Sequence, residues 1–191
     1  MKIGITGGIG SGKSYVCRLL EARGISIYDC DAAAKRLMRT SPRLQEQLTA
    51  LIGPEAYCAD ERGGGVLNKA AVARFLLASE ANAQALDALV HPAVAADFAQ
   101  SGSTWMECAI LFESGFDRLV DRVVVVTAPE PVRIARVVQR DGISEQKARQ
   151  WMARQWPQDK VRELADYEVA NDGQSDLGPQ IARLCRLLEQ S

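Results

Sequence analysis

The chain has 191 residues, of which 47% are hydrophobic, so it is long and apolar enough for one domain with a modest insertion. Its 23 basic and 24 acidic residues give a net charge of −1, which provides no overall basic field to attract nucleic acid or an anionic membrane. Five cysteines without C-x-x-C spacing, a single histidine and no apolar run of about 18 residues favour a soluble, cytoplasmic protein without a disulfide framework, zinc site or membrane span.

The first predicted elements are a buried strand over residues 2–6 and a helix over residues 15–23. Between them, residues 7–14 fit the pattern G-x-x-x-x-G-K-[ST] of the phosphate-binding P-loop. The glycines allow the backbone to turn around an anion, so that consecutive N–H groups point inward at the positive end of the following helix. We therefore expect a nucleotide site in which Lys13 reaches the β- and γ-phosphates and the Ser14 hydroxyl ligates Mg²⁺.

A second strand is predicted over residues 25–29, and the following segment is rich in helix-forming residues. Ser41-Pro42 supplies a cap and a first-turn proline for one of these helices. Residues 55–65 are interpreted as a loop ending in the flexible connector Gly63-Gly64-Gly65. We expect residues 35–100 to form a mostly helical insertion, without strand signals, over one edge of the sheet. The expected helices span residues 31–38, 43–52, 68–78 and 79–100.

The third and fourth predicted strands, residues 104–112 and 121–127, are near-continuous apolar runs, as is typical of a parallel sheet covered on both faces. The alternation of strands and helices predicts an α/β fold of the P-loop NTPase type, with a doubly wound, five-stranded parallel sheet. Ligands are expected at the carboxyl ends of its strands. The remaining expected elements are helices over residues 129–140, 144–155 and 177–190, a strand over 167–170 and a turn over 171–173.

Two carboxylates, Asp29 and Asp31, stand at the carboxyl end of the second predicted strand. We expect that strand to lie next to the P-loop strand, where an acceptor hydroxyl would meet the γ-phosphate. One carboxylate would accept the proton of that hydroxyl, and the other would orient substrate or a metal-bound water. The alternative is structural: Asp29 ends the strand and Asp31 caps the next helix.

Three arginines, Arg133, Arg136 and Arg140, recur at helical spacing after the fourth strand. Phosphoryl transfer needs positive charge and a cover that excludes water, so they are candidates for a lid, but a solvated helix face gives the same pattern. Glu113 follows the third strand and could contact substrate or lie in a surface turn. His91, ahead of Pro92, could contact substrate or cap a helix.

Together these residues resemble the dephospho-coenzyme A kinase family over nearly the whole chain. The most specific pieces are the P-loop from Thr6 to Ser14, Asp29-Cys30-Asp31 for the family's D-A-D, and His91-Pro92. The others are Ile110-Leu111-Phe112-Glu113 for L-L-F-E, Arg136 with Gln139-Arg140-Asp141 for the lid, Gln155, and Asn171-Asp172-Gly173 for N-x-G.

The resemblance implies ATP-dependent phosphorylation of the ribose 3′-hydroxyl of dephospho-CoA, with Mg²⁺ held in part by Ser14. It implies Asp31 as general base and Lys13 and Arg140 as stabilisers of the γ-phosphate. It also implies a single kinase domain over residues 1–191, with residues 35–100 covering the substrate and residues 136–160 as the lid. Substrate contacts are expected from Asp29, Lys35, His91 and Glu113. ATP contacts are expected from Gly8, Ile9, Gly10, Ser11, Gly12, Lys13, Ser14, Tyr15, Arg136, Asn171 and Gly173.

The chain departs from the family pattern at four positions. Tyr15 replaces a threonine, which removes a hydroxyl contact to the α-phosphate and leaves the backbone N–H. Lys35 replaces an arginine, which keeps the charge but loses the bidentate fork. Glu107 and Ala109 stand where Asp and Pro are usual, so the metal is not assigned to Glu107.

Two other classes of protein remain as alternatives. A small-molecule kinase of the shikimate kinase type also combines a P-loop with D-x-D, but its insertion would differ from the long helical segment that contains His91-Pro92. A non-catalytic nucleotide switch or GTPase is weaker, because the chain has no N-K-x-D guanine motif: Asn68-Lys69 is followed by two alanines.

Overall fold

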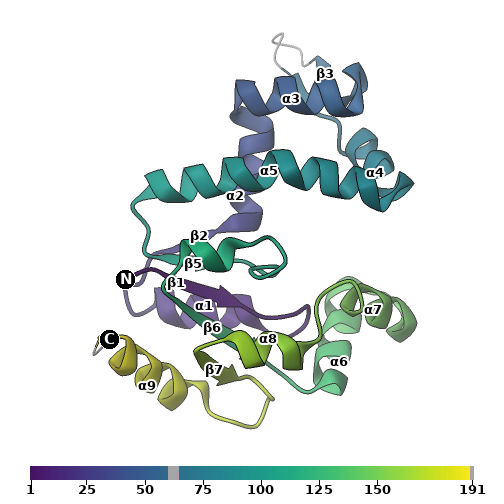
Figure 1. The fold of residues 1–191 in the computed structure, drawn as a ribbon. Coiled ribbons are helices and arrows are strands. Elements are labelled where there is room, and N and C mark those ends of the chain that lie inside the picture. Colours follow the sequence, from purple (N-terminus) through teal and green to yellow (C-terminus); the bar gives the residue numbers. More distant parts are fainter. Residues whose placement is uncertain (60–64, 190–191) are drawn as a thin grey trace. The chain divides into compact units, whose positions relative to one another are not determined.

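A computed structural model describes residues 1–59 and 65–189. Its main feature is a five-stranded sheet in the order β2-β5-β1-β6-β7 (Figure 1). The P-loop strand β1 lies in the centre and pairs in parallel with β5 on one side and β6 on the other. The expectation that the strand ending at Asp29 lies next to the P-loop strand is wrong, because β5 lies between β2 and β1. The predicted five-stranded parallel α/β fold is confirmed. The strands are β1 (Ile3–Thr6), β2 (Ile27–Asp29), β5 (Trp105–Glu107), β6 (Arg122–Thr127) and β7 (Tyr167–Ala170).

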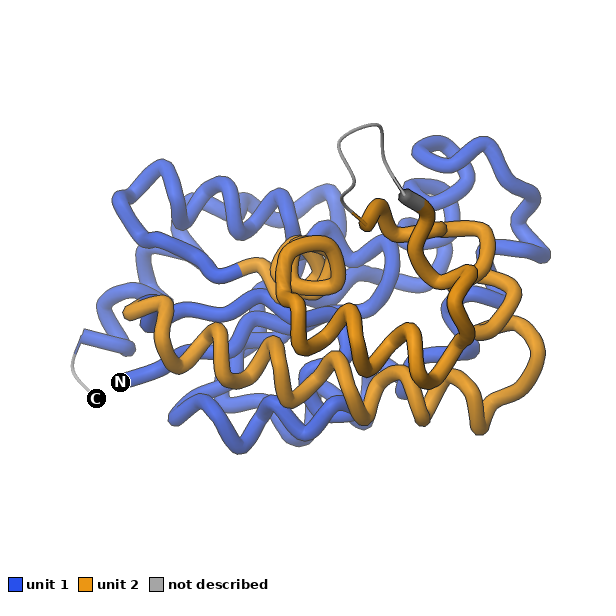
Figure 2. Tube along the Cα trace, turned by 90° about the horizontal axis from the view of Figure 1, so that it is seen from above, with its two compact units in different colours: residues 1–28, 103–191 blue, residues 29–102 orange. Residues whose placement is uncertain are grey.

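The chain divides into two compact units, which Figure 2 shows in different colours. The first unit consists of Met1–Tyr28 and Ser103–Ser191, and the second of Asp29–Gly102. Besides the strands, the first unit contains the short 3₁₀ helix η2 (Phe116–Leu119) and five α-helices. These helices are α1 (Lys13–Glu21), α6 (Glu130–Asp141), α7 (Glu145–Met152), α8 (Gln158–Leu164) and α9 (Leu177–Glu189).

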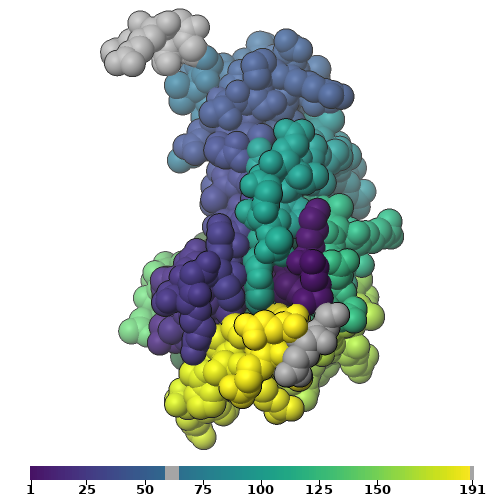
Figure 3. All heavy atoms as spheres, turned by 90° about the vertical axis from the view of Figure 1, so that its left-hand side faces the viewer, coloured from purple at the N-terminus to yellow at the C-terminus, as the bar shows by residue number. Residues whose placement is uncertain are grey.

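The core of the first unit follows from the alternation of side chains along its strands. Ile3 and Ile5 of β1 point to the same face as Val124 and Val126 of β6, and α1 and α9 cover this face with a shared apolar cluster. In Figure 3, α9 is the yellow helix and α1 lies beside it in dark purple. On the opposite face, a Cβ on Gly4 would contact Leu111, so the segment after β5 packs closely there.

The second unit is built around the long helix α5 (Glu80–Ser101), whose buried residues Leu86, Val90, Val94 and Phe98 recur every fourth position. This spacing places them on one stripe of the helix. The helices α2, α3 and α4 pack against α5. The bounds are α2 (Cys30–Thr40), α3 (Pro42–Ile52), α4 (Lys69–Ala78) and the 3₁₀ helix η1 (Pro54–Ala56). No helix within the described residues is both long and apolar enough to cross a membrane.

The second unit contains a hairpin where no strand was expected. Strands β3 (Tyr57–Ala59) and β4 (Gly65–Leu67) pair in antiparallel fashion, with Tyr57 opposite Leu67. Three residues are too few to show an alternating pattern, which is why the sequence gives no strand signal here. The expected connector residues Gly63 and Gly64 lie outside the described residues.

One expected strand differs from the structure and the expected helix over residues 79–100 is confirmed, and in both cases burial overrides local preference. The strand expected over residues 104–112 ends at Glu107, and the following residues form turns that bury Leu111 completely. The apolar residues of this run are therefore explained by their burial in the core, and they do not indicate a longer strand. Pro92 lies inside α5, whose buried residues Val90 and Val94 on either side keep the helix continuous. The helix α8 was not expected from the sequence.

Candidate active site

The P-loop is the connection between β1 and α1, and its shape depends on glycines with positive φ. Two of them, Gly10 (φ 81°) and Gly12 (φ 86°), lie in the left-handed region that residues with a Cβ rarely adopt. Space is also limiting, since a Cβ on Gly10 would lie 2.5 Å from the carbonyl oxygen of Arg133. A Cβ on Gly12 would overlap the side-chain amide of Asn171. The two glycines therefore allow both the turn and the close approach of α6 and the segment after β7.

Donors from distant segments bind the carbonyl groups of the P-loop. Arg133 Nε donates to Ile9 O at 2.9 Å, and Asn171 Nδ2 donates to Ser11 O at 2.8 Å. Arg136 donates to the carbonyls of both Gly10 (3.3 Å) and Ser11 (3.2 Å). In a trans peptide the C=O and N–H groups point in opposite directions. Fixing these carbonyls therefore also fixes the amide of the residue that follows each of them.

The loop thus presents unused amide donors. Among the described residues, the N–H groups of Gly10, Gly12 and Ser14 have no hydrogen-bond partner. They lie at the N-terminus of α1, where the helix dipole favours an anion. The N–H of Tyr15 is not among them, because it donates to Gly12 O at 2.9 Å. The Tyr15 amide thus has a partner within the loop, and its contact with the α-phosphate stays a prediction.

A cavity of about 430 Å³ opens at the P-loop. Its walls come from the P-loop, α1 and α6, and Tyr15 and Arg140 both line it. The size is within the range typical of small-molecule sites. An anionic ligand would meet backbone N–H groups and arginine side chains in this cavity.

Lys13, the P-loop lysine, pairs with Glu107, the last residue of β5. Glu107 stands opposite Ile5 in the register of β5 and β1, so its carboxylate emerges at the carboxyl edge of the sheet beside the P-loop. The two side chains are only 10% and 15% exposed. This pairing explains the carboxylate inside an otherwise apolar run.

Arg140 lies in the last turn of α6 and binds the neighbouring Asp141 with two hydrogen bonds, of 3.0 and 2.7 Å. Hydrogen bonding to this guanidinium lowers the pKa of Asp141 and raises the pKa of Arg140. The Arg140 side chain is 65% exposed. An exposed cation at the cavity wall can turn toward a ligand with little loss of packing.

In the second unit, the structure separates the two carboxylates of Asp29-Cys30-Asp31. Asp29 is the N-cap of α2, and its Oδ1 accepts a hydrogen bond of 2.9 Å from the Ala32 amide. Asp31 lies in the first turn of α2 and forms an exposed i,i+4 pair with Lys35. The alternative in which Asp31 caps the helix is therefore wrong, because Asp29 has that role.

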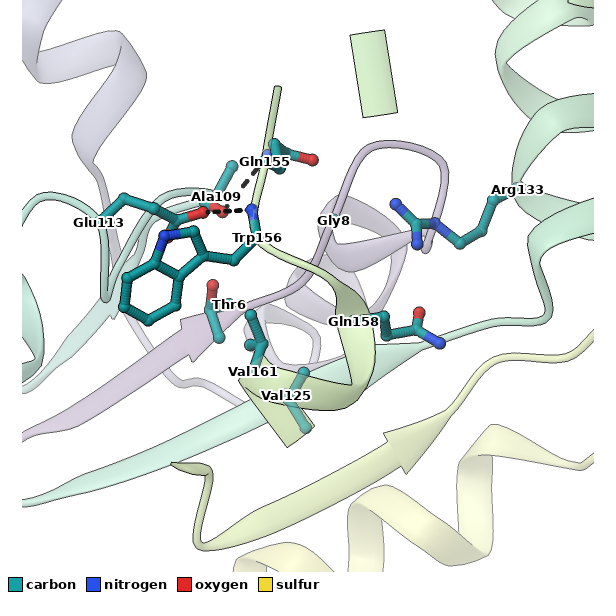
Figure 4. A pocket seen from close by; sticks show the side chains of 10 residues that line it. All are labelled: Thr6, Gly8, Ala109, Glu113, Val125, Arg133, Gln155, Trp156, Gln158 and Val161. Carbon is teal, nitrogen blue, oxygen red and sulfur yellow. Dashed lines mark hydrogen bonds between the residues drawn. The ribbon is translucent and has the colours of Figure 1, made fainter. Parts of the chain in front are cut away.

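The other expected substrate residues fall in both units. His91 lies within α5 in the second unit, and its Nε2 is 3.6 Å from Asp87 Oδ1. It does not cap a helix. Glu113 lies in the first unit, where its carboxylate accepts a 3.0 Å hydrogen bond from the Trp156 amide (Figure 4). Glu113 therefore has a structural contact in addition to any contact with substrate.

The segment after β7 contributes to the P-loop surroundings. Asn171 is buried and also accepts a 3.3 Å hydrogen bond from Arg136. Gly173 has a φ of 85°, and a Cβ there would lie 3.9 Å from Arg136. Between them, Asp172 accepts bonds from the amides of Gln174 and Ser175, which lowers the pKa of Asp172. Asn171 and Arg136 thus act on the P-loop together.

Sequence reasoning missed the partners of Ile9. Gln155 accepts a hydrogen bond from the Ile9 amide, and Arg133 is buried against the same residue. Gln155 was singled out only by family resemblance, and Arg133 only by helical spacing. A buried arginine within an amphipathic helix is a signal for such a role only once the position of the helix is known.

Comparison with known proteins identifies the family. A family model described as dephospho-CoA kinase matches residues 1–176. The chain is 40% identical over 197 aligned residues to a dephospho-CoA kinase of Bacteroides fragilis, an alignment that covers 100% of this chain and 94% of that protein.

Two solved structures place the fold. The crystal structure of TT1252 from Thermus thermophilus is similar with a TM-score of 0.80 and 30% identity, over 100% of this chain and 97% of that chain. A shikimate kinase from Bacteroides thetaiotaomicron has a TM-score of 0.57 and 14% identity, over 99% and 98% of the two chains. That second likeness is one of fold alone.

Proposed function

We propose that this chain, which belongs to the dephospho-CoA kinase family, transfers the γ-phosphate of ATP to the ribose 3′-hydroxyl of dephospho-CoA. The observation that supports this most strongly is the family match over residues 1–176, joined to a P-loop whose backbone donors face a nucleotide-sized cavity. The product is coenzyme A, and the reaction is the last step of its synthesis. Kinases of the shikimate type share the fold but are more distant relatives.

In this proposal the first unit holds the phosphoryl donor. The amides of Gly10, Gly12 and Ser14 bind the phosphates, and Lys13 exchanges its contact with Glu107 for the β- and γ-phosphates. Arg140 turns from Asp141 to the transferring group, where its charge stabilises the transition state. Residues 136–160 form the lid, and Arg136, Asn171 and Gly173 complete the surroundings of the nucleotide.

Magnesium fits the chemistry of the residues present. Mg²⁺ prefers hard oxygen ligands and is usually held by one or two protein groups together with substrate phosphates and water. The Ser14 hydroxyl, at the start of α1, is such an oxygen, and no larger cage is needed. When bound, the ion would neutralise phosphate charge as the leaving group departs.

The acceptor side of the reaction is assigned mainly to the second unit, with Glu113 as a contribution from the first. Asp31 accepts the proton of the ribose 3′-hydroxyl as that oxygen bonds to the γ-phosphorus, and the bond from phosphorus to the β,γ-bridging oxygen breaks to release ADP. The carboxylate is available because it does not cap α2 and is 76% exposed. Asp29, Lys35, His91 and Glu113 are proposed to position the acceptor, and residues 35–100 to cover it. We also propose that the protein acts in the cytoplasm.

The two aspartates provide the test and its matched control. We expect Asp31→Asn to lower kcat by about 10²- to 10⁴-fold in a coupled assay with ATP and dephospho-CoA, because the amide cannot take the proton. Its melting temperature and its ATP affinity should stay close to those of the wild type. Asp29→Ala should instead destabilise the fold by about 0.5–2 kcal/mol through loss of the α2 cap.

Several outcomes would contradict these assignments. A near-normal kcat for Asp31→Asn would mean that another group takes the proton. Turnover of shikimate in preference to dephospho-CoA by the wild-type protein would overturn the substrate. A loss of folding stability in Asp31→Asn equal to that in Asp29→Ala would mean that Asp31 has a structural role.

A further inference from the structure

Both backbone groups of Ile9, in the first half of the P-loop, bind side chains from later segments. The Ile9 N–H donates to Gln155 Oε1 at 2.8 Å, and the Ile9 carbonyl accepts from Arg133 Nε at 2.9 Å. Gln155 lies between α7 and α8, beyond the end of α7 at Met152, and Arg133 lies in α6. Two segments of the first unit therefore hold the same loop residue from its donor and its acceptor side.

These bonds determine the orientation of two successive peptide groups. The peptide between Gly8 and Ile9 is held at both ends, because Gly8 O accepts from the Ser11 amide at 3.0 Å while the Ile9 N–H is bound by Gln155. In the next peptide, Arg133 holds the carbonyl, and the Gly10 N–H points the opposite way. The Gly10 amide is one of the donors proposed for the phosphates, so Gln155 acts one peptide away from it.

The arrangement is tightly packed. A Cβ on Gly8 would overlap the Arg133 guanidinium and would lie 3.4 Å from Gln155 Oε1. Figure 4 shows Gln155 and Arg133 around the loop at Gly8, in a pocket that Thr6 and Val125 line from the sheet. A loop this closely confined has little freedom to reorient while both side chains stay in place.

Gln155 is itself held by its neighbours. Its Nε2 is 3.5 Å from Ala109 O, and the next residue, Trp156, donates its amide to Glu113. The Trp156 ring stacks on Phe112 with 3° between the planes and 6.3 Å between centroids, and Lys160 Nζ lies 3.2 Å from its centroid on the ring face. These contacts tie the connection between α7 and α8 to the segment after β5.

We propose that Gln155 is a positioning residue for nucleotide binding: by holding the Ile9 amide, it fixes the P-loop in the conformation that presents the Gly10 and Gly12 amides to phosphate. It acts through Ile9. The inference requires only that the P-loop binds ATP, and it is independent of the identity of the phosphoryl acceptor.

The first test is Gln155→Met, which keeps the length of the side chain but removes the strong acceptor. We expect the Kd and the KM for ATP to rise about tenfold, in line with the loss of one partly buried hydrogen bond, while the KM for dephospho-CoA changes less than twofold. Gln158→Met is the matched control. The Gln158 Oε1 also accepts a backbone N–H, from Ala128 at 3.1 Å, and Gln158 lines the same pocket, but within the described part of the chain it forms no hydrogen bond to the P-loop. It should leave the Kd for ATP unchanged.

The second measurement is hydrogen exchange of the Ile9 amide, which needs neither turnover nor ligand. In the nucleotide-free wild type this amide should already be protected, and Gln155→Met should lose that protection while Gln158→Met retains it. Free exchange of Ile9 in the wild type would overturn the proposal, even if Gln155→Met failed to fold. An unchanged Kd for ATP in a folded Gln155→Met, or an equal loss in Gln158→Met, would also overturn it. If ATP binds as expected but dephospho-CoA is not phosphorylated, the proposed reaction fails and this inference stands.

Discussion

The pairing of Lys13 with Glu107 links two residues that sequence patterns treat separately. A cation and a carboxylate that are largely removed from water each need a counter-charge. Here Lys13 supplies positive charge to Glu107, and Glu107 supplies negative charge to Lys13. A triphosphate would compete with Glu107 for Lys13. Replacement of the lysine should therefore affect both ligand binding and folding stability.

We expect Lys13→Ala to lose nearly all activity and most ATP affinity, because charge-assisted bonds to phosphate are lost in the ground state and in the transition state. Its folding stability should also fall, by roughly 1–3 kcal/mol, since Glu107 loses this partner. Titration calorimetry with ATP and thermal melting measure the two effects.

A double variant separates these effects. Adding Glu107→Gln to Lys13→Ala removes the carboxylate charge and should recover part of the lost stability without recovering ATP binding. Full turnover in the single variant would contradict the P-loop assignment. Recovery of ATP affinity in the double variant would show that the lysine acts only by neutralising Glu107.

At the scale of elements, α6 shows what periodicity can and cannot predict. From their spacing, Arg133, Arg136 and Arg140 were expected on one helix. The sequence did not decide whether these arginines belong to a lid or to a solvated helix face. In the structure the first is buried against Ile9, the second binds P-loop carbonyls, and the third is exposed at the cavity wall. The P-loop partners of the first two lie more than 120 residues away in the sequence, so no local pattern contains this information.

The end of α6 gives a kinetic prediction. Arg140→Ala should lower kcat about 10²-fold or more with a smaller change in the KM for dephospho-CoA, because its charge acts mainly on the transferring phosphoryl group. Arg149→Ala is the control: this arginine is also exposed, and it pairs with Glu130 rather than lining the P-loop cavity. Steady-state kinetics of both variants test whether Arg140 acts on the transferring phosphoryl group. A wild-type kcat for Arg140→Ala would mean that Arg140 is a solvated surface residue.

The same helix end has a defined pH dependence. Because the Arg140 bond lowers the pKa of Asp141 in the folded state, the pair is stabilising above the unfolded pKa of about 3.9 and is lost as pH falls through the lower, folded value. Carbon-detected NMR titration of Asp141 should show a folded pKa below that of an unfolded peptide. An Arg140→Ala variant should return it to the ordinary range.

The strands and helices differ in how far the sequence predicts them. The strand β7 was predicted with its observed bounds, and β6 to within one residue, because their apolar residues are bounded by polar or turn-forming ones. The run after β5 was misassigned because burial of Leu111 in turns gives the same composition as a strand. Pro92 is the opposite case, in which a helix continues through a residue that disfavours it.

Pro92→Ala should stabilise the second unit. The proline removes one backbone donor from the middle of α5 and crowds the preceding turn, at a cost of up to about 3 kcal/mol, which its stiffening of the unfolded chain offsets only in part. We expect a gain of about 1–2 kcal/mol, measured as a rise in the melting temperature of several degrees. A lower melting temperature would mean that α5 bends around the proline to fit its neighbours.

At the scale of the whole molecule, the proposed donor and acceptor groups belong to different compact units, except for Glu113, an acceptor group in the first unit. Lys13, Arg140 and the P-loop amides are in the first unit, and Asp31, Lys35 and His91 are in the second. The sequence indicated an insertion within a P-loop fold, but the first unit is discontinuous in the chain. Its two parts meet through pairing of β1 with β5 and β6, through the apolar cluster between α1 and α9, and through the side chains that bind the P-loop. Pairing between strands so far apart in the chain depends on the whole fold, so it cannot be predicted from any single segment of the sequence.

This division predicts two separable patterns of hydrogen exchange. ATP added to the full chain should slow exchange mainly in residues 8–16 of the P-loop and α1, whereas dephospho-CoA should slow exchange mainly in α2 and α5, because each ligand orders the groups that bind it. Lys13→Ala should abolish the protection caused by ATP and leave that caused by dephospho-CoA, and Asp31→Asn should preserve the response to ATP. Mass spectrometry of peptides from the wild type and both variants measures all of these effects. If ATP protected only the second unit, or if Lys13→Ala removed both patterns together, the assignment of donor and acceptor binding to separate units would be wrong.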